Sequence, residues 1–192
     1  MKKNKKINIK MSINSIQKTL DTSPNVNYIK IKIQDEYYLL IKSISKLLEE
    51  IINKNKKKRH KCYKDCFYSE KIPSLTIYEY ISSIVKYTGI NESTLILSIV
   101  SITSLMNKTK NTISYNNIYK LIITSVFLNV KFNEDFNFSS KLYAYVGRIP
   151  NEELNFLEYQ YYSLCDYSLF VKSNIYEEYY CFFQNKAKNM KL

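Results

Sequence analysis

Apolar residues recur along most of this chain at the three- and four-residue spacing that is typical of α-helices. Between Asp35 and about Lys54 they form a single stripe, which predicts a first helix. The same spacing predicts six more helices, at about residues 77–88, 92–107, 114–131, 139–146, 150–164 and 174–184. Since residues 114–131 leave almost no polar face, we expect that helix in the middle of a bundle. The predicted fold class is all-α.

Local signals indicate where several of these helices begin and end. Pro73 disfavours helix before it, and Thr76 is suited to cap the helix that follows. Gly89 is expected to end that helix in the left-handed conformation, and Gly147 is expected to end the short helix. Further helix starts are predicted at Asn91, Ser114 and Ser173.

The positive charge of the chain is concentrated near its N-terminus. Among 192 residues, 29 are Lys or Arg and 17 are Asp or Glu, which gives a net charge of +12. Residues 1–70 hold 17 basic and 7 acidic side chains, a net charge of +10, whereas residues 71–192 hold 12 and 10. We therefore expect four parts: a flexible basic arm (1–34), an N-terminal helix with a Lys-rich linker (35–65), a helical domain (66–184) and a tail (185–192).

Charge and hydropathy limit the partners and the location of the protein. A basic chain suggests nucleic acid, but only Arg59 and Arg148 carry the guanidinium group that phosphate and base recognition favour. We therefore do not expect nucleic acid as the partner. Since neither a signal peptide nor an apolar stretch of membrane-spanning length is found, we expect no membrane contact and an intracellular location, in the nucleus, the cytoplasm or both. The four cysteines are then expected as reduced thiols.

Residue types with catalytic or metal-binding chemistry are sparse in this sequence. His60, Cys62 and Cys66 form the one candidate metal cluster, and no fourth ligand lies near them, so we expect no bound metal. The single histidine argues against a His-dependent triad, and two glycines are too few for a Gly-rich phosphate-binding loop. The sequence thus excludes nucleotide-dependent enzymes that use such loops.

Two charged residues interrupt the apolar pattern at places where a binding site is possible. Lys131 ends the nearly all-apolar helix, and Glu158 lies midway along the helix predicted at 150–164. Both charges should therefore emerge at the rim of the core, where each needs a partner to offset its desolvation. An ordinary salt bridge and a site for a binding partner are both compatible with this pattern.

The order of the elements and the residues at their ends resemble those of cyclins, specifically the P-type or Pho80-like class with a single cyclin box. The resemblance covers about residues 36–183. It rests on the segments 47–55 (LLEEIINKN), 72–81 (IPSLTIYEYI), 124–135 (TSVFLNVKFNED), 143–149 (YAYVGRI) and 153–158 (ELNFLE).

This resemblance implies a cyclin fold: a five-helix cyclin box with an additional N-terminal helix and a C-terminal helix. It further implies a non-catalytic subunit that binds and activates a cyclin-dependent protein kinase, with cell-cycle control as the expected process. Such a subunit is expected to have no catalytic residues, no cofactor and no small-molecule substrate. In cyclins, the residues that correspond to Lys131 and Glu158 together bind the C-helix region of the kinase. Neighbouring contacts are expected from Phe132, Glu134, Tyr162 and Tyr167.

Two positions depart from the family pattern. Asn129 stands where the family has a small residue, so it needs a hydrogen-bond partner or a position that faces the kinase. Arg148 stands where a second glycine usually follows Gly147. Two other interpretations stay open: a cyclin-fold module that binds nucleic acid or serves transcription through its Lys-rich N-terminal region, and a helical scaffold with neither activity.

Overall fold

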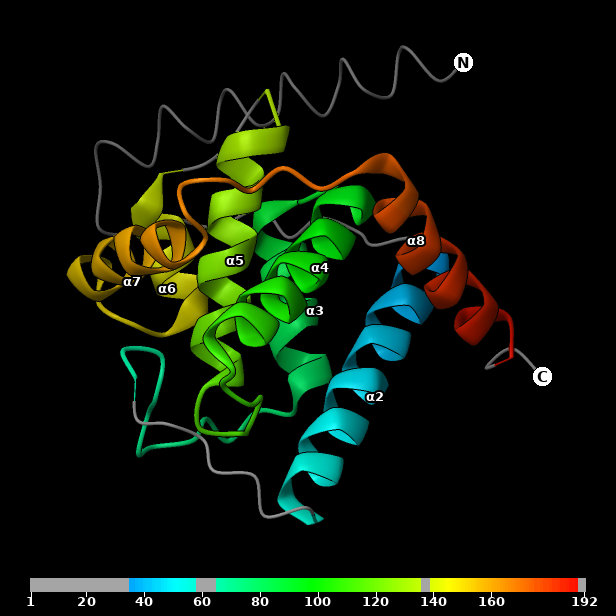
Figure 1. The fold of residues 1–192 in the computed structure, drawn as a ribbon, viewed down its shortest axis with the longest axis horizontal. Helices are drawn as coiled ribbons and strands as arrows, with labels where there is room; N and C mark the ends of the chain where they lie inside the picture. Colours follow the sequence, from blue (N-terminus) through cyan, green and yellow to red (C-terminus); the bar gives the residue numbers. More distant parts are fainter. Residues whose placement is uncertain (1–34, 58–64, 136–138, 190–192) are drawn as a thin grey trace. The chain divides into compact units, whose positions relative to one another are not determined.

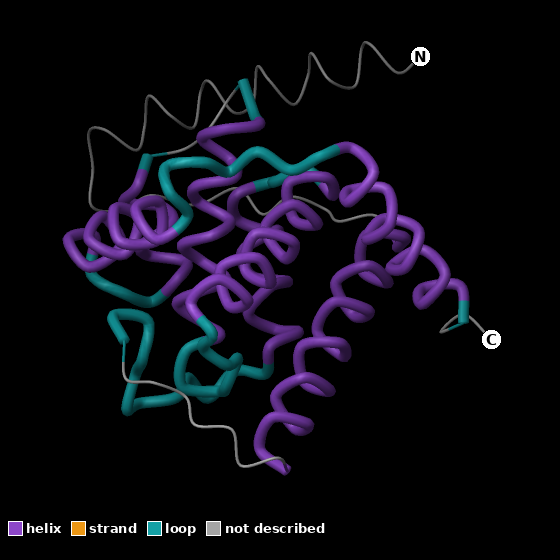
Figure 2. Tube along the Cα trace, in the orientation of Figure 1, coloured by secondary structure: helices purple, strands orange, loops and turns teal. Residues whose placement is uncertain are grey.

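The computed structural model describes residues 35–57, 65–135 and 139–189. These residues form seven α-helices and the loops between them (Figure 1). They are α2 (Asp35–Lys57), α3 (Ile77–Thr88), α4 (Glu92–Thr109), α5 (Ile118–Asn133), α6 (Ser140–Gly147), α7 (Asn151–Leu164) and α8 (Ser173–Lys188). Figure 2 shows only helices and loops over these ranges. The predicted all-α class is confirmed, and each predicted helix has its counterpart.

Several predictions concern residues outside the described ranges. These are the basic arm at 1–34, the part of the Lys-rich linker that holds His60 and Cys62, and the end of the tail. Within the ranges, Cys66, Cys165 and Cys181 are free. None of the helices described there is long and apolar enough to cross a membrane.

Helix α5 lies at the centre of the bundle because nearly all of its residues are apolar. Residues 121–130 are buried without exception, and α5 contacts α3, α4, α6 and α7 (Figure 1). Helix α2 packs on α3 and α8, and α8 also contacts α4. The predicted position of the most apolar helix is therefore confirmed.

The predicted ends of helix α3 are confirmed in detail. The side chain of Thr76 accepts a hydrogen bond from the N–H of Glu79 at 3.2 Å, and the Glu79 carboxylate accepts one from the N–H of Thr76 at 2.9 Å. This reciprocal pair is a capping box, which satisfies two N–H groups at the start of the helix. At the other end, Gly89 is left-handed with φ 63°, a conformation that glycine adopts without steric cost.

Helix α5 begins at Ile118, later than the predicted start at Ser114. The difference arises from Asn117, whose buried side chain accepts from the N–H of Ser114 and donates to the carbonyl of Thr112, each at 2.9 Å. These bonds stabilise a turn between Ser114 and Asn117 in place of a first helical turn.

Two other predicted helix starts differ in their capping. Asn91 is the N-cap residue of α4 but makes no side-chain capping bond. Ser173 is already helical, and Lys172 is the N-cap residue of α8. Helix α8 also continues past the predicted end at Gln184, because Ala187 is buried and Lys186 forms an ion pair with Glu50 of α2 at 3.0 Å.

Candidate functional site

The C-terminal end of α5 meets the middle of α7 at one edge of the bundle. Helix α5 is buried up to Val130, after which Lys131 and Phe132 emerge, and Phe132 is 57% exposed. On α7 the apolar spacing turns one face to the core, formed by Leu154, Leu157 and Tyr161. Glu158 follows directly after one of these buried positions, so its carboxylate reaches the border between core and surface.

Lys131 and Glu158 form an ion pair between the two helices. The side chains are 46% and 21% exposed, respectively, and the Lys131 Nζ lies 4.9 Å from the centre of the Phe127 ring. An ion pair this exposed contributes only about 0–1 kcal/mol to folding. The fold therefore gains little from placing these charges together, and both remain accessible to a partner.

Beside this pair lies a groove of about 410 Å³ between α5, α7 and the segment that follows α7. Its walls are mainly apolar or aromatic, with the two charges and one amide among them. The lining residues are Leu128, Lys131, Phe132, Asn155, Glu158, Tyr159, Tyr162 and Leu169. The groove thus offers apolar surface together with one donor and one acceptor of opposite charge.

Exposed aromatic side chains surround the groove. Tyr159 is 61% exposed and Tyr167 is 55% exposed. Tyr167 does not line the groove, but its ring contacts that of Tyr162 edge-on, with centroids 5.3 Å apart. Two consecutive left-handed residues, Asp166 with φ 52° and Tyr167 with φ 57°, hold the chain in the turn that makes this contact. Such backbone strain is common where a side chain must be aimed.

Glu134, the remaining predicted contact residue, lies away from the groove walls. It follows α5, and its carboxylate accepts a hydrogen bond from the N–H of Asn91 at 3.0 Å. Glu134 therefore ties the end of α5 to the start of α4. Of the predicted residues, the structure brings Lys131, Phe132, Glu158 and Tyr162 together, with Tyr167 on the rim.

Asn129 is fully buried and hydrogen-bonded, which is the first of the two alternatives that its place in an apolar helix left open. Its Nδ2 donates to the carbonyl of Ser125 at 2.9 Å, and Asn133 Nδ2 donates to the Asn129 carbonyl at 2.9 Å. An unpaired amide at this depth would cost the full desolvation of its polar atoms. Asn129 is thus a buried core residue and does not face outward.

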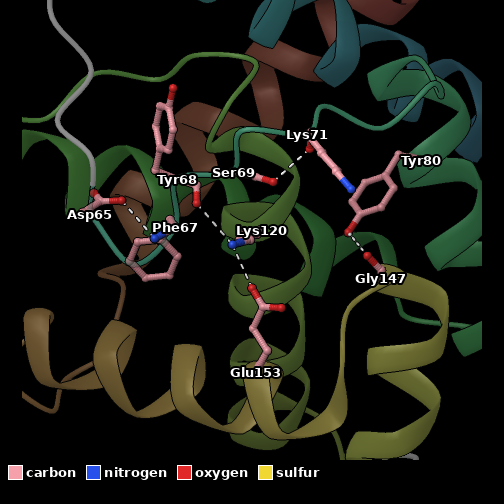
Figure 3. Close-up of polar contacts among 9 residues, drawn as sticks. All are labelled: Asp65, Phe67, Tyr68, Ser69, Lys71, Tyr80, Lys120, Gly147 and Glu153. Carbon is pink, nitrogen blue, oxygen red and sulfur yellow. Dashed lines mark hydrogen bonds and ion pairs between the residues drawn. The ribbon is translucent and has the colours of Figure 1, made fainter.

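A second ion pair joins the same two helices and serves as a comparison. Lys120 Nζ lies 2.8 Å from Glu153 and also donates to the carbonyl of Tyr68 at 3.2 Å (Figure 3). The Lys120 amine therefore fastens the segment before α3 onto α5 and α7. The Lys120 side chain is 17% exposed, whereas that of Lys131 is 46% exposed. Lys131 is therefore the more accessible of the two amines.

Four groove residues were not predicted from the sequence: Leu128, Asn155, Tyr159 and Leu169. On α7, positions 155, 158, 159 and 162 follow the helical spacing of one face. Extending that spacing from Glu158 would have found Asn155 and Tyr159. Leu169 lies beyond the helix, and no periodic signal places it.

The side chains at this edge are mainly apolar or aromatic, with one pair of opposite charges. The described residues bring together no group of three or more His, Cys, Asp or Glu that could hold a metal ion. Burial raises the pKa of the Cys165 thiol to about 11, so the thiol is protonated at neutral pH and a poor nucleophile. What the site offers is an apolar groove, exposed rings and a pair of opposite charges, which suits a protein partner.

Comparison with known proteins agrees with the order of the elements. The sequence model of the cyclin family matches residues 38–169, which span α2 to the segment after α7. Cyclin-U2-1 of Arabidopsis thaliana is 30% identical over 122 residues, which are 63% of this chain and 55% of that protein. The chain thus spans little more than half the length of this relative.

Two further relatives come from a plant and a yeast. Cyclin-U2-2 of Arabidopsis thaliana is 26% identical over 158 residues, 78% of this chain and 69% of that protein. PHO85 cyclin-7 of Saccharomyces cerevisiae is 30% identical over 125 residues, 59% of this chain and 44% of that protein. In each case the similar region is long enough to include most of the helical bundle.

Proposed function

The chain belongs to the cyclin family, and we propose that it acts as a non-catalytic regulatory subunit that binds and activates a cyclin-dependent protein kinase. Its relatives among the plant U-type cyclins and the PHO85 cyclins agree with the P-type class predicted from the sequence. The proposed process is control of the cell cycle, in the nucleus or the cytoplasm.

One observation carries the proposal. The Lys131–Glu158 pair stands at the edge of an apolar groove that exposed aromatic rings surround. Exposed apolar surface of this kind is unfavourable in water unless a partner covers it. Aromatic side chains are also the residues that most often dominate the binding energy of protein interfaces.

In the proposed complex, the kinase places its C-helix region against the groove. The apolar walls exclude water, while Lys131 offers a donor and Glu158 an acceptor to polar groups of the kinase. Docking holds the kinase C-helix inward, so that its glutamate pairs with the catalytic lysine and the activation loop is ordered. All phosphoryl-transfer chemistry then belongs to the kinase.

The experiment that tests this proposal exchanges the two charges. Lys131→Glu combined with Glu158→Lys keeps an ion pair within the chain but presents each charge with the wrong sign to the partner. Because like charges across an interface cost several kcal/mol, we expect the affinity for a purified cyclin-dependent kinase of the same organism to fall at least about a hundredfold. Titration calorimetry measures both affinities.

A matched control exchanges the charges of another pair. Glu50 and Lys186 join α2 to α8, neither of which lines the groove. Glu50→Lys with Lys186→Glu should leave the affinity unchanged, and circular dichroism should show both exchanged proteins folded. Undiminished kinase binding by the Lys131 and Glu158 exchange contradicts the assigned site.

A further inference from the structure

A group of polar side chains is buried between α4, α5 and α7. Ser101 on α4, Ser125 and Asn129 on α5, and Tyr161 on α7 are each at most 5% exposed. Burying a hydroxyl or an amide costs free energy unless the group is hydrogen-bonded. Bonds between the three helices meet part of this requirement.

Their hydrogen bonds form one continuous chain across the three helices. The Tyr161 hydroxyl lies 3.1 Å from the Ser101 Oγ and 3.2 Å from the Ser125 Oγ. The Ser125 Oγ donates to the carbonyl of Ser98 at 2.9 Å. Asn129 Nδ2 lies 3.4 Å from the same Ser125 Oγ, in addition to its bond with the Ser125 carbonyl.

Counting protons gives this chain a direction. The Ser98 carbonyl can only accept, so it takes the single hydroxyl proton of Ser125. The Ser125 oxygen then accepts from Tyr161, and Ser101 donates to the Tyr161 oxygen. Burial raises the pKa of the Tyr161 hydroxyl above its usual range, so the proton stays in place. Removing the Tyr161 hydroxyl therefore leaves two buried serine oxygens with a partner missing.

The chain of bonds ends beside the groove. The last hydrogen bond of this chain on α5 joins Asn133 to Asn129, and Lys131 lies between these two residues in the sequence. On α7, Tyr161 lies one helical turn after Glu158. The bond between Tyr161 and Ser125 joins α7 to α5. These are also the two helices that carry the charged pair.

We propose that the Tyr161 hydroxyl is a positioning group for the kinase-binding groove, an inference that rests on the function proposed above. Its bond to Ser125 limits how far α7 slides along α5 and so sets the spacing of Lys131 and Glu158. A hydrogen bond tolerates only small changes in distance and angle, whereas apolar side chains repack at modest cost. The bond to Ser101 adds α4 as a third fixed point.

Tyr161 itself touches no partner, because it is fully buried. Its effect on binding is exerted through Glu158 and Lys131. This separates it from Tyr162 and Tyr159, whose side chains line the groove and contact the partner in the proposed complex.

The test is Tyr161→Phe, which removes one oxygen and keeps the ring that contacts Phe67 edge-on at 5.8 Å. We expect the dissociation constant for a purified cyclin-dependent kinase of the same organism to rise about three- to tenfold, the effect of losing one buried hydrogen bond. Ser101→Ala should raise it by a smaller factor, because the bond between Tyr161 and Ser125 survives.

Tyr80→Phe is the matched control. Tyr80 is buried on α3, and its hydroxyl donates to the Gly147 carbonyl at 3.2 Å (Figure 3). Since α3 does not line the groove, this variant should lower the melting temperature about as much as Tyr161→Phe does. Its kinase affinity should stay that of the wild type.

A second readout separates positioning from general weakening of the fold. In a Lys131→Ala background the pair is already broken, so Tyr161→Phe should add little further loss of affinity. An equal loss in both backgrounds would mean that Tyr161 acts on the fold alone and not through the pair.

The outcomes also separate this inference from the proposed function. If the wild type binds the kinase and Tyr161→Phe binds it equally well, the positioning role is wrong and the proposed function stands. If the wild type binds no such kinase, the proposed function is contradicted, and a crystal structure of Tyr161→Phe decides on the positioning role. We expect Lys131 and Glu158 to separate beyond about 4 Å there, and an intact pair overturns the inference.

Discussion

Arg148 holds a backbone conformation that a residue with a side chain rarely adopts. It follows α6 with φ 57°, and its N–H donates to the Tyr145 carbonyl at 3.2 Å. In this left-handed region the Cβ atom crowds the neighbouring backbone, which is why glycine is favoured at such helix ends. The resemblance to P-type cyclins indicates a glycine here in the family, and this geometry supplies the physical reason.

Arg148→Gly should therefore stabilise the chain. Relief of the backbone strain outweighs the extra freedom that glycine gives the unfolded state, so the free energy of unfolding should rise by about 0.5–1 kcal/mol. Urea denaturation measures the change. Arg148→Ala removes the same charge but keeps the Cβ atom, so it should give no gain. Equal stabilisation by both variants would contradict the claim that the backbone at Arg148 is strained.

At the scale of elements, α5 and α6 approach each other closely at a single glycine. A Cβ atom placed on Gly147 would lie 2.7 Å from Cγ1 of Ile123 on α5. Such a distance is well inside van der Waals contact, so one of the helices would have to shift. Helix α6 therefore depends on this glycine for its close contact with α5.

The sign of the effect of Gly147→Ala should depend on Ile123. In the wild type, overpacking should cost about 1–3 kcal/mol and exceed the gain of about 1 kcal/mol that alanine brings within a helix. In an Ile123→Ala background the clash is gone, so the same substitution should stabilise. Thermal unfolding of the four proteins measures this cycle. Destabilisation by the same amount in both backgrounds would show that the close approach does not limit α6.

Helix ends could be predicted from the sequence where the signal is local. The prediction failed where a contact with a distant residue determines the end. Thr76 and Gly89 terminate α3 through bonds within the helix and its flanks, which sequence shows directly. Helix α5 starts late because of the buried side chain of Asn117, and α8 extends to Lys188 because Ala187 packs against the bundle. Burial of those two residues depends on elements far away in the sequence.

The candidate site was predictable to the same extent. The apolar run before Lys131 and the spacing around Glu158 indicate that both charges reach the rim, and the structure pairs them. The groove beside them was not predictable, since its walls combine two helices with Leu169 from a turn held by left-handed residues. Likewise, the bond between the Glu134 carboxylate and the N–H of Asn91 joins two residues far apart in the sequence, and no periodic signal indicates it.

At the scale of the whole molecule, most of the net charge and the groove lie in different parts of the sequence. The first 70 residues carry 17 basic and 7 acidic side chains, whereas residues 71–192 carry 12 and 10. The groove lies in the nearly neutral part. Binding through an apolar groove with one ion pair depends weakly on salt, whereas binding to nucleic acid weakens steeply as salt rises. The net charge of the chain therefore does not decide the partner of the helical domain.

In the proposed function, this chain switches on a cyclin-dependent kinase through the groove beside Lys131 and Glu158. The most direct measurement titrates the purified chain into a purified, inactive cyclin-dependent kinase of the same organism and follows phosphate transfer to a peptide. We predict that activity rises and saturates near equimolar chain, while the protein with exchanged charges at Lys131 and Glu158 leaves activity at background. Kinase activity that stays at background with saturating wild-type chain, or that both proteins raise equally, would contradict the account.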